Sequence, residues 1–375
     1  MKICFVSAHP MTYPGGVQNH ILALKKEYEK RGHEVKIIYA KDKSSKNGKK
    51  DEILFGRSVY LPGNASKANL SLEFNTRNIK KNLEKEDFDV LHFQNFGIFL
   101  PWQVLRASRK IKGKRALNVL TLHAFWDASR MLKILSGFFS SYFLPKFDAL
   151  ITVSEPVSKQ IRYNGISEII PNGIDLKNFS PEGEKIKKFC DDKINILFVG
   201  RIEERKGLIY LLKAFEILKA KYKDIRLIVV GDGFDRKKME RFAEYRKIQD
   251  VFFEGEATNE ELPRYYRTAD ICCFPAIFGE AFGIVLLEAM ASGKPVVAFS
   301  NAGYKEVLVA KGKDFLVEPK NIKGLSEKLE RLIQNKELRE SLGNWGRIEA
   351  EKYSWLKIAS KSLNFYDKVI KSKSQ

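Results

Sequence analysis

Short apolar segments alternate with helix-like stretches along the whole chain, and this alternation constrains the fold more than any other feature. In the first half, apolar runs typical of strands lie at residues 2–7, 34–39, 90–93, 117–122 and 149–153. In the second half they lie at residues 194–200, 226–231, 251–254, 271–274, 295–299 and 315–317. Strands that alternate with helices predict parallel sheets covered by helices on both faces. Functional residues should then follow the carboxyl ends of strands, where the loops gather.

The alternation stops and restarts once, which predicts two facing Rossmann-like domains in an α/β fold. Residues 1–175 form the expected N-terminal domain, and residues 194–353 form the expected C-terminal domain. Residues 176–193 are polar, Lys-rich and non-periodic, so we predict a linker there. Residues 354–375 contain an amphipathic stretch, which predicts a final helix that returns to the first domain.

The composition narrows the choice of partners. Apolar residues make up 44% of the chain and charged residues 30%, which is typical of a soluble globular protein. The net charge of +20 favours a polyanion such as nucleic acid, an anionic membrane face or a phosphorylated ligand. The sequence starts directly with a strand, and no apolar run approaches the ~20 residues that span a bilayer. We therefore expect a cytoplasmic protein whose contact with the inner face of the cell membrane is at most peripheral.

Two loops that follow predicted strands are candidates for phosphate binding. Gly15 and Gly16 precede a predicted helix, where free amides and close backbone approach favour an anion. Arg201 and Lys206 lie in the loop after the first strand of the second domain, where two cations can neutralise a departing diphosphate without a metal ion. Each loop also has a simpler interpretation, as a common glycine turn and as a solvated basic loop.

The strongest single motif places Glu280 in a glycine-containing loop and Glu288 in the apolar helix start that follows. An acid in so apolar a run is costly unless a hydrogen-bonding partner meets it. Adjacent ribose hydroxyls are such a partner, and the free amides at residues 283–285 can hold phosphate oxygens. The alternative is a partly exposed helix glutamate.

Three further motifs carry weaker signals. His123 closes the strand at residues 117–122 and should therefore lie at its functional end, although a lone histidine is usually structural. Gly231-Asp232-Gly233 has Arg236 where a dinucleotide site needs its third glycine, so a tight turn is favoured. Asp87-Phe88-Asp89 spells a metal-binding pattern but precedes a strand, which is the wrong end for a site. The four cysteines are expected to be buried thiols, and no His/Cys cluster has the spacing of metal ligands.

Taken together, these residues resemble retaining glycosyltransferases of family 4, which have the GT-B fold. The matching positions extend over most of the chain: Gly15-Gly16, His123, Ser154-Glu155, Pro171-Asn172-Gly173-Ile174-Asp175, Gly200-Arg201, Lys206-Gly207, Glu280 and Glu288. Within the family, Pro14-Gly15-Gly16-Val17-Gln18 and Gly279-Glu280-Ala281-Phe282-Gly283-Ile284-Val285-Leu286 look most like the bacterial phosphatidylinositol mannosyltransferases. Those enzymes use GDP-mannose and dock on the membrane.

The resemblance implies a metal-independent transferase without a cofactor, which moves a hexose from a nucleotide-diphosphate sugar to an acceptor hydroxyl with retention. In that scheme Glu288 binds the ribose, Arg201 and Lys206 bind the diphosphate, and Glu280 holds the donor sugar. The implied catalytic set is His123, Glu280, Arg201 and Lys206, and the implied acceptor contacts are Gln18 and His123. The implied donor-binding set is Gly15, Gly16, Arg201, Lys206, Ala257, Glu280, Phe282, Gly283, Ile284, Val285 and Glu288.

Two departures from the mannosyltransferase pattern keep the substrates open. Asn259 and Leu262 stand where those enzymes contact guanine with an acid and a lysine, and Ala124 stands where a hydroxyl residue follows the histidine. GDP-mannose and a lipid-linked or phosphoinositol-type acceptor are favoured, and UDP-glucose or UDP-GlcNAc with a soluble acceptor is the alternative. A sugar-nucleotide 2-epimerase shares the fold. A nucleic-acid-binding protein would explain the charge, but the sequence shows no recognition motif for nucleic acid.

Basic residues of the first domain suggest how a membrane would be reached. Arg77, Lys80 and Lys81 share one face of a predicted helix, and a lysine-rich loop spans residues 41–50. Leu72, Ile79 and Leu83 supply an apolar side that fits a core equally well. We expect this basic face to bind an anionic membrane, and the alternative is a solvated face of a very basic protein.

Overall fold

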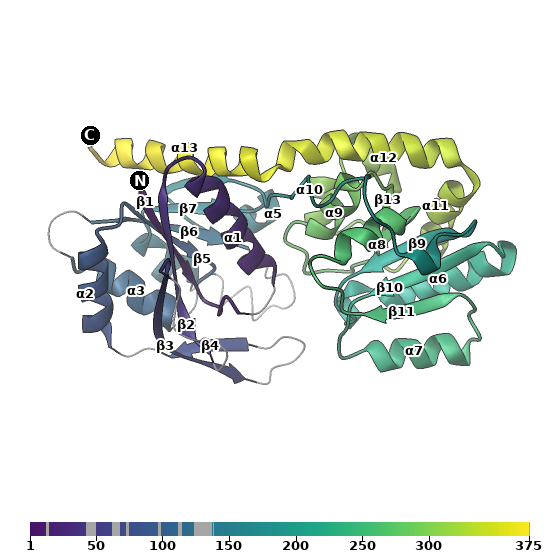
Figure 1. The fold of residues 1–375 in the computed structure, drawn as a ribbon, viewed down its shortest axis with the longest axis horizontal. Helices are drawn as coiled ribbons and strands as arrows, with labels where there is room; N and C mark the ends of the chain where they lie inside the picture. The colour runs from purple at the N-terminus through teal and green to yellow at the C-terminus, as the bar shows by residue number, and fades with distance from the viewer. Residues whose placement is uncertain are drawn as a thin grey trace. The chain divides into compact units, whose positions relative to one another are not determined.

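The computed structural model describes residues 1–12, 15–42, 50–61, 68–72, 75–96, 99–111, 115–123, 137 and 139–374. The chain divides into two compact units (Figure 1). The first unit combines Met1–Gly173 with Trp355–Gln375, and the second unit is Ile174–Ser354. In the described stretches, every helix is too short or too polar to cross a lipid bilayer.

The first unit is built on an eight-stranded sheet with the order β4-β3-β2-β1-β5-β6-β7-β8. Its strands are β1 (Lys2–Ser7), β2 (Glu34–Lys41), β3 (Glu52–Leu61), β4 (Ala68–Leu72), β5 (Val90–Gln94), β6 (Leu117–Leu122), β7 (Ala149–Thr152) and β8 (Ile166–Ile169). The pair β3–β4 is antiparallel, and the other recorded pairs are parallel. The central strands β1, β5, β6 and β7 are buried along their whole length or nearly so, as their continuous apolar runs predict.

The helices of the first unit include one that comes from the far end of the chain. They are α1 (Gly16–Glu29), α2 (Thr76–Glu86), α3 (Leu100–Ser108), α5 (Glu155–Lys159) and α13 (Trp355–Ser374), with a short 3-10 turn η1 (Leu144–Lys146). Helix α13, drawn in yellow in Figure 1, packs on α1 and buries Phe365, Tyr366 and Val369 in the core of this unit. The predicted return of the C-terminal helix is therefore present.

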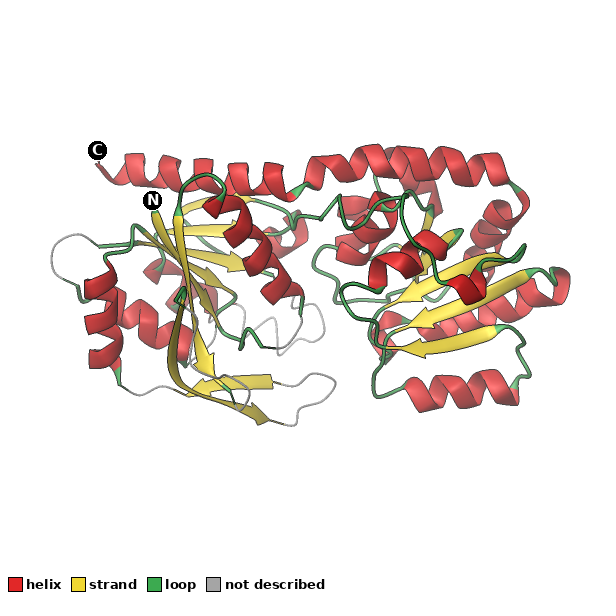
Figure 2. Ribbon diagram, viewed as in Figure 1, coloured by secondary structure: helices red, strands yellow, loops and turns green. Residues whose placement is uncertain are grey.

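The second unit contains a six-stranded parallel sheet with the order β11-β10-β9-β12-β13-β14. Its strands are β9 (Ile194–Val199), β10 (Ile225–Val230), β11 (Val251–Gly255), β12 (Ile271–Phe274), β13 (Val296–Phe299) and β14 (Leu316–Val317). Its helices are α6 (Leu208–Lys221), α7 (Arg236–Tyr245), α8 (Leu262–Thr268), α9 (Ile284–Ala291), α10 (Ala302–Val307), α11 (Ile322–Gln334) and α12 (Lys336–Ala350), with 3-10 turns η2 (Lys187–Phe189), η3 (Glu204–Lys206), η4 (Ala310–Phe315) and η5 (Glu351–Tyr353). Figure 2 shows these helices flanking the strands.

Residues 176–193, predicted as a linker, are part of the second unit instead. Phe179 and Phe189 are buried, and the Arg267 guanidinium donates hydrogen bonds to the carbonyl oxygens of Asn178 and Ser180. Two buried aromatic side chains and one arginine that binds backbone carbonyls are enough to hold the segment in place. Its otherwise polar sequence gave no sign of this packing. The chain instead passes from one unit to the other near Gly173 and again near Trp355.

Candidate active site

The loop after β9 carries three cations on a tightly turned backbone. Gly200 and Gly207 have positive φ values of 152° and 72°, and a Cβ on Gly207 would collide with the carbonyl oxygen of Pro275. Glycine is therefore required where the turn η3 runs into α6. The turn projects Arg205 and Lys206, whereas the Arg201 side chain is 55% exposed at the start of the loop.

One carboxylate oxygen of Glu280 forms ion pairs with two of these cations. The Lys206 Nζ lies 2.7 Å from the Glu280 Oε1, and the Arg205 Nη1 donates to the same oxygen over 2.9 Å. Burial alone would raise the pKa of the Glu280 carboxyl, but the charges and hydrogen bonds of Lys206 and then Arg205 outweigh it and hold the pKa below its usual value. Glu280 is therefore ionised near neutral pH, and Lys206 is paired with it in the structure.

Glu288 lies in the second turn of α9 in the opposite electrostatic situation. Its Oε2 accepts a hydrogen bond of 2.8 Å from the Tyr266 hydroxyl. Burial raises the pKa of Glu288 to about 7, although the Tyr266 hydrogen bond and the Lys206 charge both work against the rise. The contacts of the described residues thus only partly offset the cost of burying the Glu288 charge, as is typical of a carboxylate that binds a ligand through further hydrogen bonds.

The backbone between these two glutamates is fixed by close packing. Gly283 begins α9 with a φ of 113°, and a Cβ there would lie 2.7 Å from the Tyr304 ring. Phe282 is buried with its ring centroid 5.7 Å from that of Tyr353. The first amides of a helix lack intrahelical partners, so the backbone N–H groups at Gly283, Ile284 and Val285 are available to an anion.

The segment after β11 is where a nucleobase contact is expected. Ala257 is half-buried, Asn259 is exposed, and Leu262 is half-buried at the start of α8. Thr258 and Glu261 form a capping box, in which each backbone N–H donates to the other side chain over 3.0 and 3.2 Å. Asn259 and Leu262 carry no titratable group, so neither can offer a charge to a nucleobase.

The Gly231-Asp232-Gly233 loop has a structural explanation. A Cβ on Gly231 would collide with the carbonyl oxygen of Gly200, and one on Gly233 would collide with that of Ile202. The two glycines let this loop pack directly against the Arg201 loop. The preference for a tight turn over a dinucleotide site agrees with this packing.

In the first unit, His123 is held by neutral hydrogen bonds. Its backbone N–H donates to the Asn95 Oδ1 over 2.9 Å, and its Nε2 donates to the Gln94 Oε1 over 2.7 Å. The ring also contacts His20 edge to face, with centroids 4.7 Å apart. Burial lowers the pKa of His123 to about 4, and a hydrogen bond with Asn172 opposes the shift. The imidazole is therefore neutral near pH 7.

The same hydrogen-bond chain continues into the core. Gln94 contacts His92, whose Nε2 lies 2.6 Å from the Thr121 hydroxyl and whose Nδ1 lies 2.6 Å from the Tyr366 hydroxyl. The Tyr366 hydroxyl in turn lies 3.2 Å from that of Tyr28. His123 is thus linked through buried polar groups to helix α13.

At the start of α1, Gly16 has empty space among the described residues where a side chain would be, whereas Gly15 before it does not. A Cβ added to Gly16 would meet no described atom within 4 Å, whereas one on Gly15 would press on the Gln18 side chain. Gln18 donates from its Nε2 to the Pro10 carbonyl oxygen over 3.2 Å and so folds back over the loop. Packing within the described residues therefore gives no reason for glycine at position 16. Pro14 and Ala124 lie outside the described residues.

The predicted basic face lies on α2. Arg77 and Lys81 are exposed, and Lys80 is half-buried with its Nζ 3.4 Å from Glu84. Ile79 and Leu83 are buried, so the apolar side of this helix belongs to the core, while Leu72 lies in β4. Lys43, Lys46 and Lys49 of the lysine-rich loop lie outside the described residues.

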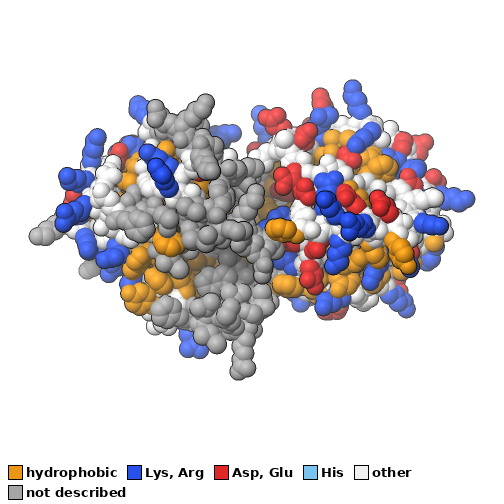
Figure 3. All heavy atoms as spheres, turned by 90° about the horizontal axis from the view of Figure 1, so that it is seen from below, with side chains coloured by type: hydrophobic (Ala, Val, Ile, Leu, Met, Phe, Trp, Pro, Cys, Tyr) orange, Lys and Arg blue, Asp and Glu red, His pale blue; other side chains and the backbone are white. Residues whose placement is uncertain are grey.

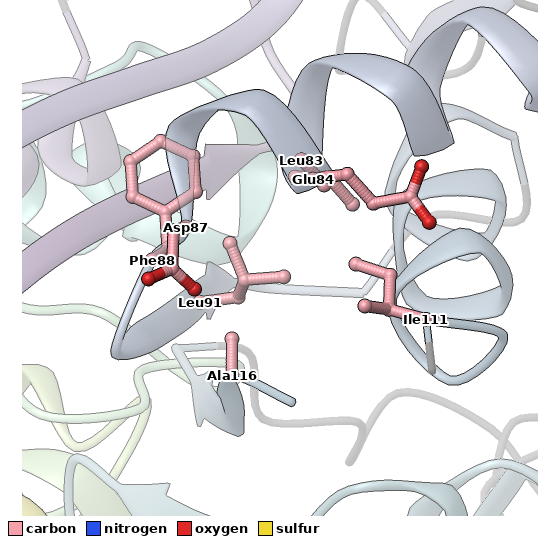
Figure 4. A pocket seen from close by; sticks show the side chains of 7 residues that line it. All are labelled: Leu83, Glu84, Asp87, Phe88, Leu91, Ile111 and Ala116. Carbon is pink, nitrogen blue, oxygen red and sulfur yellow. The ribbon is translucent and has the colours of Figure 1, made fainter. Parts of the chain in front are cut away.

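The Asp87-Phe88-Asp89 pattern lies at the amino end of β5, as expected. The Asp89 carboxylate accepts the backbone N–H of Lys2 over 2.7 Å and so ties β1 to β5. A pocket of about 240 Å³ lies beside it between α2 and the segment after α3, away from the carboxyl ends of the strands (Figure 4). Its lining residues are Leu83, Glu84, Asp87, Phe88, Leu91, Ile111 and Ala116. Among the residues that the structure describes, no group of three His, Cys, Asp or Glu side chains is arranged to hold a metal ion.

Comparison with known proteins identifies the family. A family model described as Glycosyltransferase Family 4 matches residues 14–178, and one described as Glycosyl transferases group 1 matches residues 180–349. A phosphatidyl-myo-inositol mannosyltransferase of Mycobacterium tuberculosis is 30% identical over 379 residues, covering 98% of this chain and 97% of the relative. The chain belongs to glycosyltransferase family 4.

Solved structures of other glycosyltransferases share the GT-B fold of this enzyme. A glycosyltransferase of Rickettsia africae superimposes with a TM-score of 0.77 at 20% identity, covering 99% of both chains. A protein of Anabaena solved with UDP and glucose superimposes with a TM-score of 0.72 at 18% identity, covering 97% of this chain and 98% of that one. The predicted family, fold class and enzyme class are confirmed.

Three residues of this glycosyltransferase's candidate site were missed by the sequence analysis. Arg205 pairs with Glu280, Tyr266 donates to Glu288, and Gln94 accepts from His123. Arg205 had a local signal, since it is a second cation next to Lys206 in the same loop. Gln94 also had one, since it directly follows the strand predicted at residues 90–93. Tyr266 had none, because its partner comes from an element distant in sequence. The residues that the sequence did select remain predictions as to their roles.

Proposed function

We propose that this glycosyltransferase moves a hexose, with mannose favoured, from a nucleoside-diphosphate sugar to a lipid-linked or phosphoinositol-type acceptor at a membrane surface, with retention. The observation that carries the proposal is the cluster of Lys206, Arg205 and Glu280 beside the Glu288 helix α9. It occurs in a chain that aligns over nearly its full length with proteins named phosphatidyl-myo-inositol mannosyltransferase.

The second unit binds the donor in this scheme. Glu288 accepts both ribose hydroxyls, which would add to the Tyr266 hydrogen bond and offset the burial that raises the pKa of this carboxyl. The diphosphate lies at the amino end of α9, where Arg201 and Lys206 neutralise its charge. Glu280, ionised and fixed by its cations, accepts hydrogen bonds from the hydroxyls of the transferred sugar.

The transfer step needs charge stabilisation and positioning more than a nucleophilic side chain. The bond from the sugar C1 to the phosphate oxygen breaks, and the bond from C1 to the acceptor oxygen forms on the same face. The acceptor proton passes to the departing phosphate oxygen, so the products are the glycoside and a nucleoside diphosphate. Arg201 and Lys206 stabilise the growing negative charge in place of a metal ion. Transfer should therefore survive chelation of divalent metals, and its loss in EDTA would refute this part.

His123 and Gln18 of the first unit are assigned to the acceptor and the reaction centre. His123 has a pKa of about 4, so near pH 7 it acts as a neutral hydrogen-bonding group and not as a charged acid. A Cβ on Gly16 would meet no described atom within 4 Å, so the space beside its backbone can admit a ligand.

Charge distribution supports docking on an anionic membrane. The first unit carries 33 Lys and Arg residues against 16 Asp and Glu, a net charge of +17. The second unit carries 33 against 30, a net charge of +3. On the face in Figure 3, acidic and basic side chains are interspersed over the second unit, while basic side chains predominate in the described part of the first. Each Lys or Arg near an anionic surface contributes about 1 kcal/mol.

An aromatic group of the first unit has the character of a membrane interface as well. Trp102 and Tyr142 lie together, Tyr142 is 48% exposed, and the Lys146 Nζ lies 3.7 Å above the centre of the Tyr142 ring. Trp, Tyr and Lys are the residues that anchor proteins at the boundary between water and lipid.

A UDP-sugar donor with a soluble acceptor is the second candidate. It is favoured by Asn259 and Leu262, which offer no charged group to guanine, and by the Anabaena neighbour solved with UDP and glucose. Initial rates with GDP-mannose, UDP-glucose and UDP-GlcNAc, each with phosphatidylinositol vesicles or a water-soluble polyol, distinguish the two. The first proposal expects product from GDP-mannose on vesicles. Product from a UDP-sugar on the soluble acceptor alone would replace it with the second.

A further inference from the structure

Five charged side chains of the second unit form a chain of alternating sign. The Arg201 Nη2 lies 3.7 Å from the Glu203 Oε1, and the Arg205 Nε lies 2.6 Å from the same oxygen. On its other side Arg205 contacts Glu280, which also binds Lys206. The order Arg201, Glu203, Arg205, Glu280, Lys206 thus places one arginine in the centre, between two carboxylates.

We propose that Arg205 is a positioning residue that holds both carboxylates while Arg201 and Lys206 turn to the donor diphosphate. This inference rests on the proposed function, because it concerns how the same site receives its nucleotide. In the structure Lys206 is engaged by Glu280, so it must exchange partners, at least in part, to bind a phosphate.

The exchange would be costly without a third cation. The Glu203 and Glu280 side chains are only 8% and 12% exposed, and a buried carboxylate left without a partner is strongly destabilised. Within this group of five, Arg205 is the side chain that contacts both acids. Its Nη1 donates a hydrogen bond to Glu280, while its Nε forms an ion pair with the Glu203 Oε1, which accepts no hydrogen bond among the described residues. A lysine ammonium, a single point charge, cannot meet both carboxylates with the same geometry.

A purely structural role for the Arg205 side chain is less well supported. The loop is already attached at this point by its backbone, because the Ile277 N–H donates to the Arg205 carbonyl oxygen over 2.7 Å. The glycine at position 207 fixes the following turn. The backbone of the loop is therefore held without the Arg205 side chain, and the guanidinium serves to balance the charges of Glu203 and Glu280.

A double-mutant cycle on nucleotide affinity tests the proposal. UDP and GDP are each titrated calorimetrically into wild type, Arg205→Gln, Glu280→Gln and the double variant. In Arg205→Gln, Lys206 becomes the main cation of Glu280 and is withheld from the diphosphate, so affinity should fall roughly tenfold or more. Adding Glu280→Gln releases Lys206 and should bring affinity back to within about twofold of Glu280→Gln alone.

The matched control is Arg246→Gln, which breaks an exposed ion pair with Glu216 on the same unit and should leave affinity unchanged. If Arg205→Gln does not fold, Arg205→Lys takes its place in the cycle, with a smaller loss and the same restoration. Wild-type affinity in the Arg205 variant, or a loss that Glu280→Gln does not restore, would overturn the proposal. A wild-type protein that binds neither diphosphate would instead refute the proposed function and this proposal with it.

Discussion

The two units of this glycosyltransferase use charge in opposite ways. In the second unit the candidate residues include an ionised cluster, in which Glu280 pairs with Lys206 and Arg205, and burial raises the pKa of the nearby Glu288 to about 7. In the first unit the candidate residue His123 is uncharged near pH 7, because burial lowers its pKa to about 4.

The surfaces show the reverse distribution. Most of the net charge, +17, belongs to the first unit, and only +3 belongs to the second. Under the proposed function, charge in the second unit serves the binding of a diphosphate at short range. We propose that in the first unit it acts at the surface, where it would attract an anionic partner, while His123 stays neutral.

The largest effect is expected from Lys206→Ala. Because the diphosphate gains negative charge as it leaves, losing this cation should lower kcat by about 10² to 10³. Initial rates at saturating donor measure it, and Lys213→Ala, which removes an exposed lysine from α6, should retain the wild-type rate. The variant should unfold near the wild-type temperature because Arg205 still pairs with Glu280. A rate above half of wild type would remove Lys206 from the mechanism.

The surface side of the comparison is tested by changing Arg77, Lys80 and Lys81 together to Ser. At about 1 kcal/mol for each residue, binding to vesicles with anionic lipid should fall roughly a hundredfold. Co-sedimentation at several salt concentrations measures it, since screening should weaken wild-type binding too.

The matched control for that triple lies in the second unit. Lys237, Lys238 and Arg241 are exposed on α7, and changing them to Ser removes the same charge from the whole chain. If both triples weaken vesicle binding equally, overall charge and not the first unit is responsible, and the comparison between units fails.

The donor side is tested by Glu288→Gln. An amide offers one acceptor oxygen to two ribose hydroxyls, so nucleotide affinity should fall about ten- to a hundredfold. Wild-type affinity should also fall as pH drops through about 7, because the protonated acid accepts less well, whereas the variant should lose this pH dependence. Calorimetric titration between pH 5.5 and 8.5, roughly one and a half units either side of that pKa, measures both effects. A flat wild-type profile with an unchanged variant would exclude Glu288 as the ribose ligand.

A smaller effect is expected from Gln94→Ala in the first unit. Losing one neutral hydrogen bond of about 1 kcal/mol to His123 should lower transfer about fivefold. Nucleotide affinity should stay at the wild-type value, since the proposed contacts to the ribose and diphosphate lie in the second unit. A parallel loss of affinity would show that the two units do not divide the work as proposed.

The smallest effect concerns stability. The folded-state pKa of Glu288 lies near 7, above its usual 4.5, so its contribution to stability is fully present below pH 4.5 and is lost as pH rises through 7. Glu288→Gln should therefore raise the free energy of unfolding by about 1–2 kcal/mol at pH 8 and leave it unchanged at pH 4. Urea titrations at the two pH values check this, and a destabilised variant at pH 8 would contradict it.

Apolar patterning was enough to locate the central strands, and spacing was enough to select the glycine loops and the two glutamates. Strands β3, β4 and β8 were missed: β3 contains Gly56 and Arg57, and β4 and β8 are short edge strands whose residues need not be uniformly apolar. Residues 176–193, predicted as a linker, belong to the second unit, and the aromatic anchors Phe179 and Phe189 that hold them leave no periodic pattern in the sequence.

The candidate site shows the same division. Residues that follow a strand directly, such as His123 and Arg201, are visible from sequence. Gln94 also follows a predicted strand, but its contact with His123 lies between neighbouring strands and could not be predicted. Tyr266 has no such position, because it is defined by a contact between two helices, which leaves no local pattern.

Helix α13 gives the protein an unusual order of assembly. The core of the first unit is completed by Phe365, Tyr366 and Val369, which follow the whole second unit in the chain. On the ribosome, residues 1–173 must therefore wait, with an apolar face uncovered, until the whole second unit has been made. The second unit, although it comes later in the chain, holds all its own strands and helices and is free to fold first. A chain truncated after residue 354 should thus carry a folded second unit joined to an unfinished first unit.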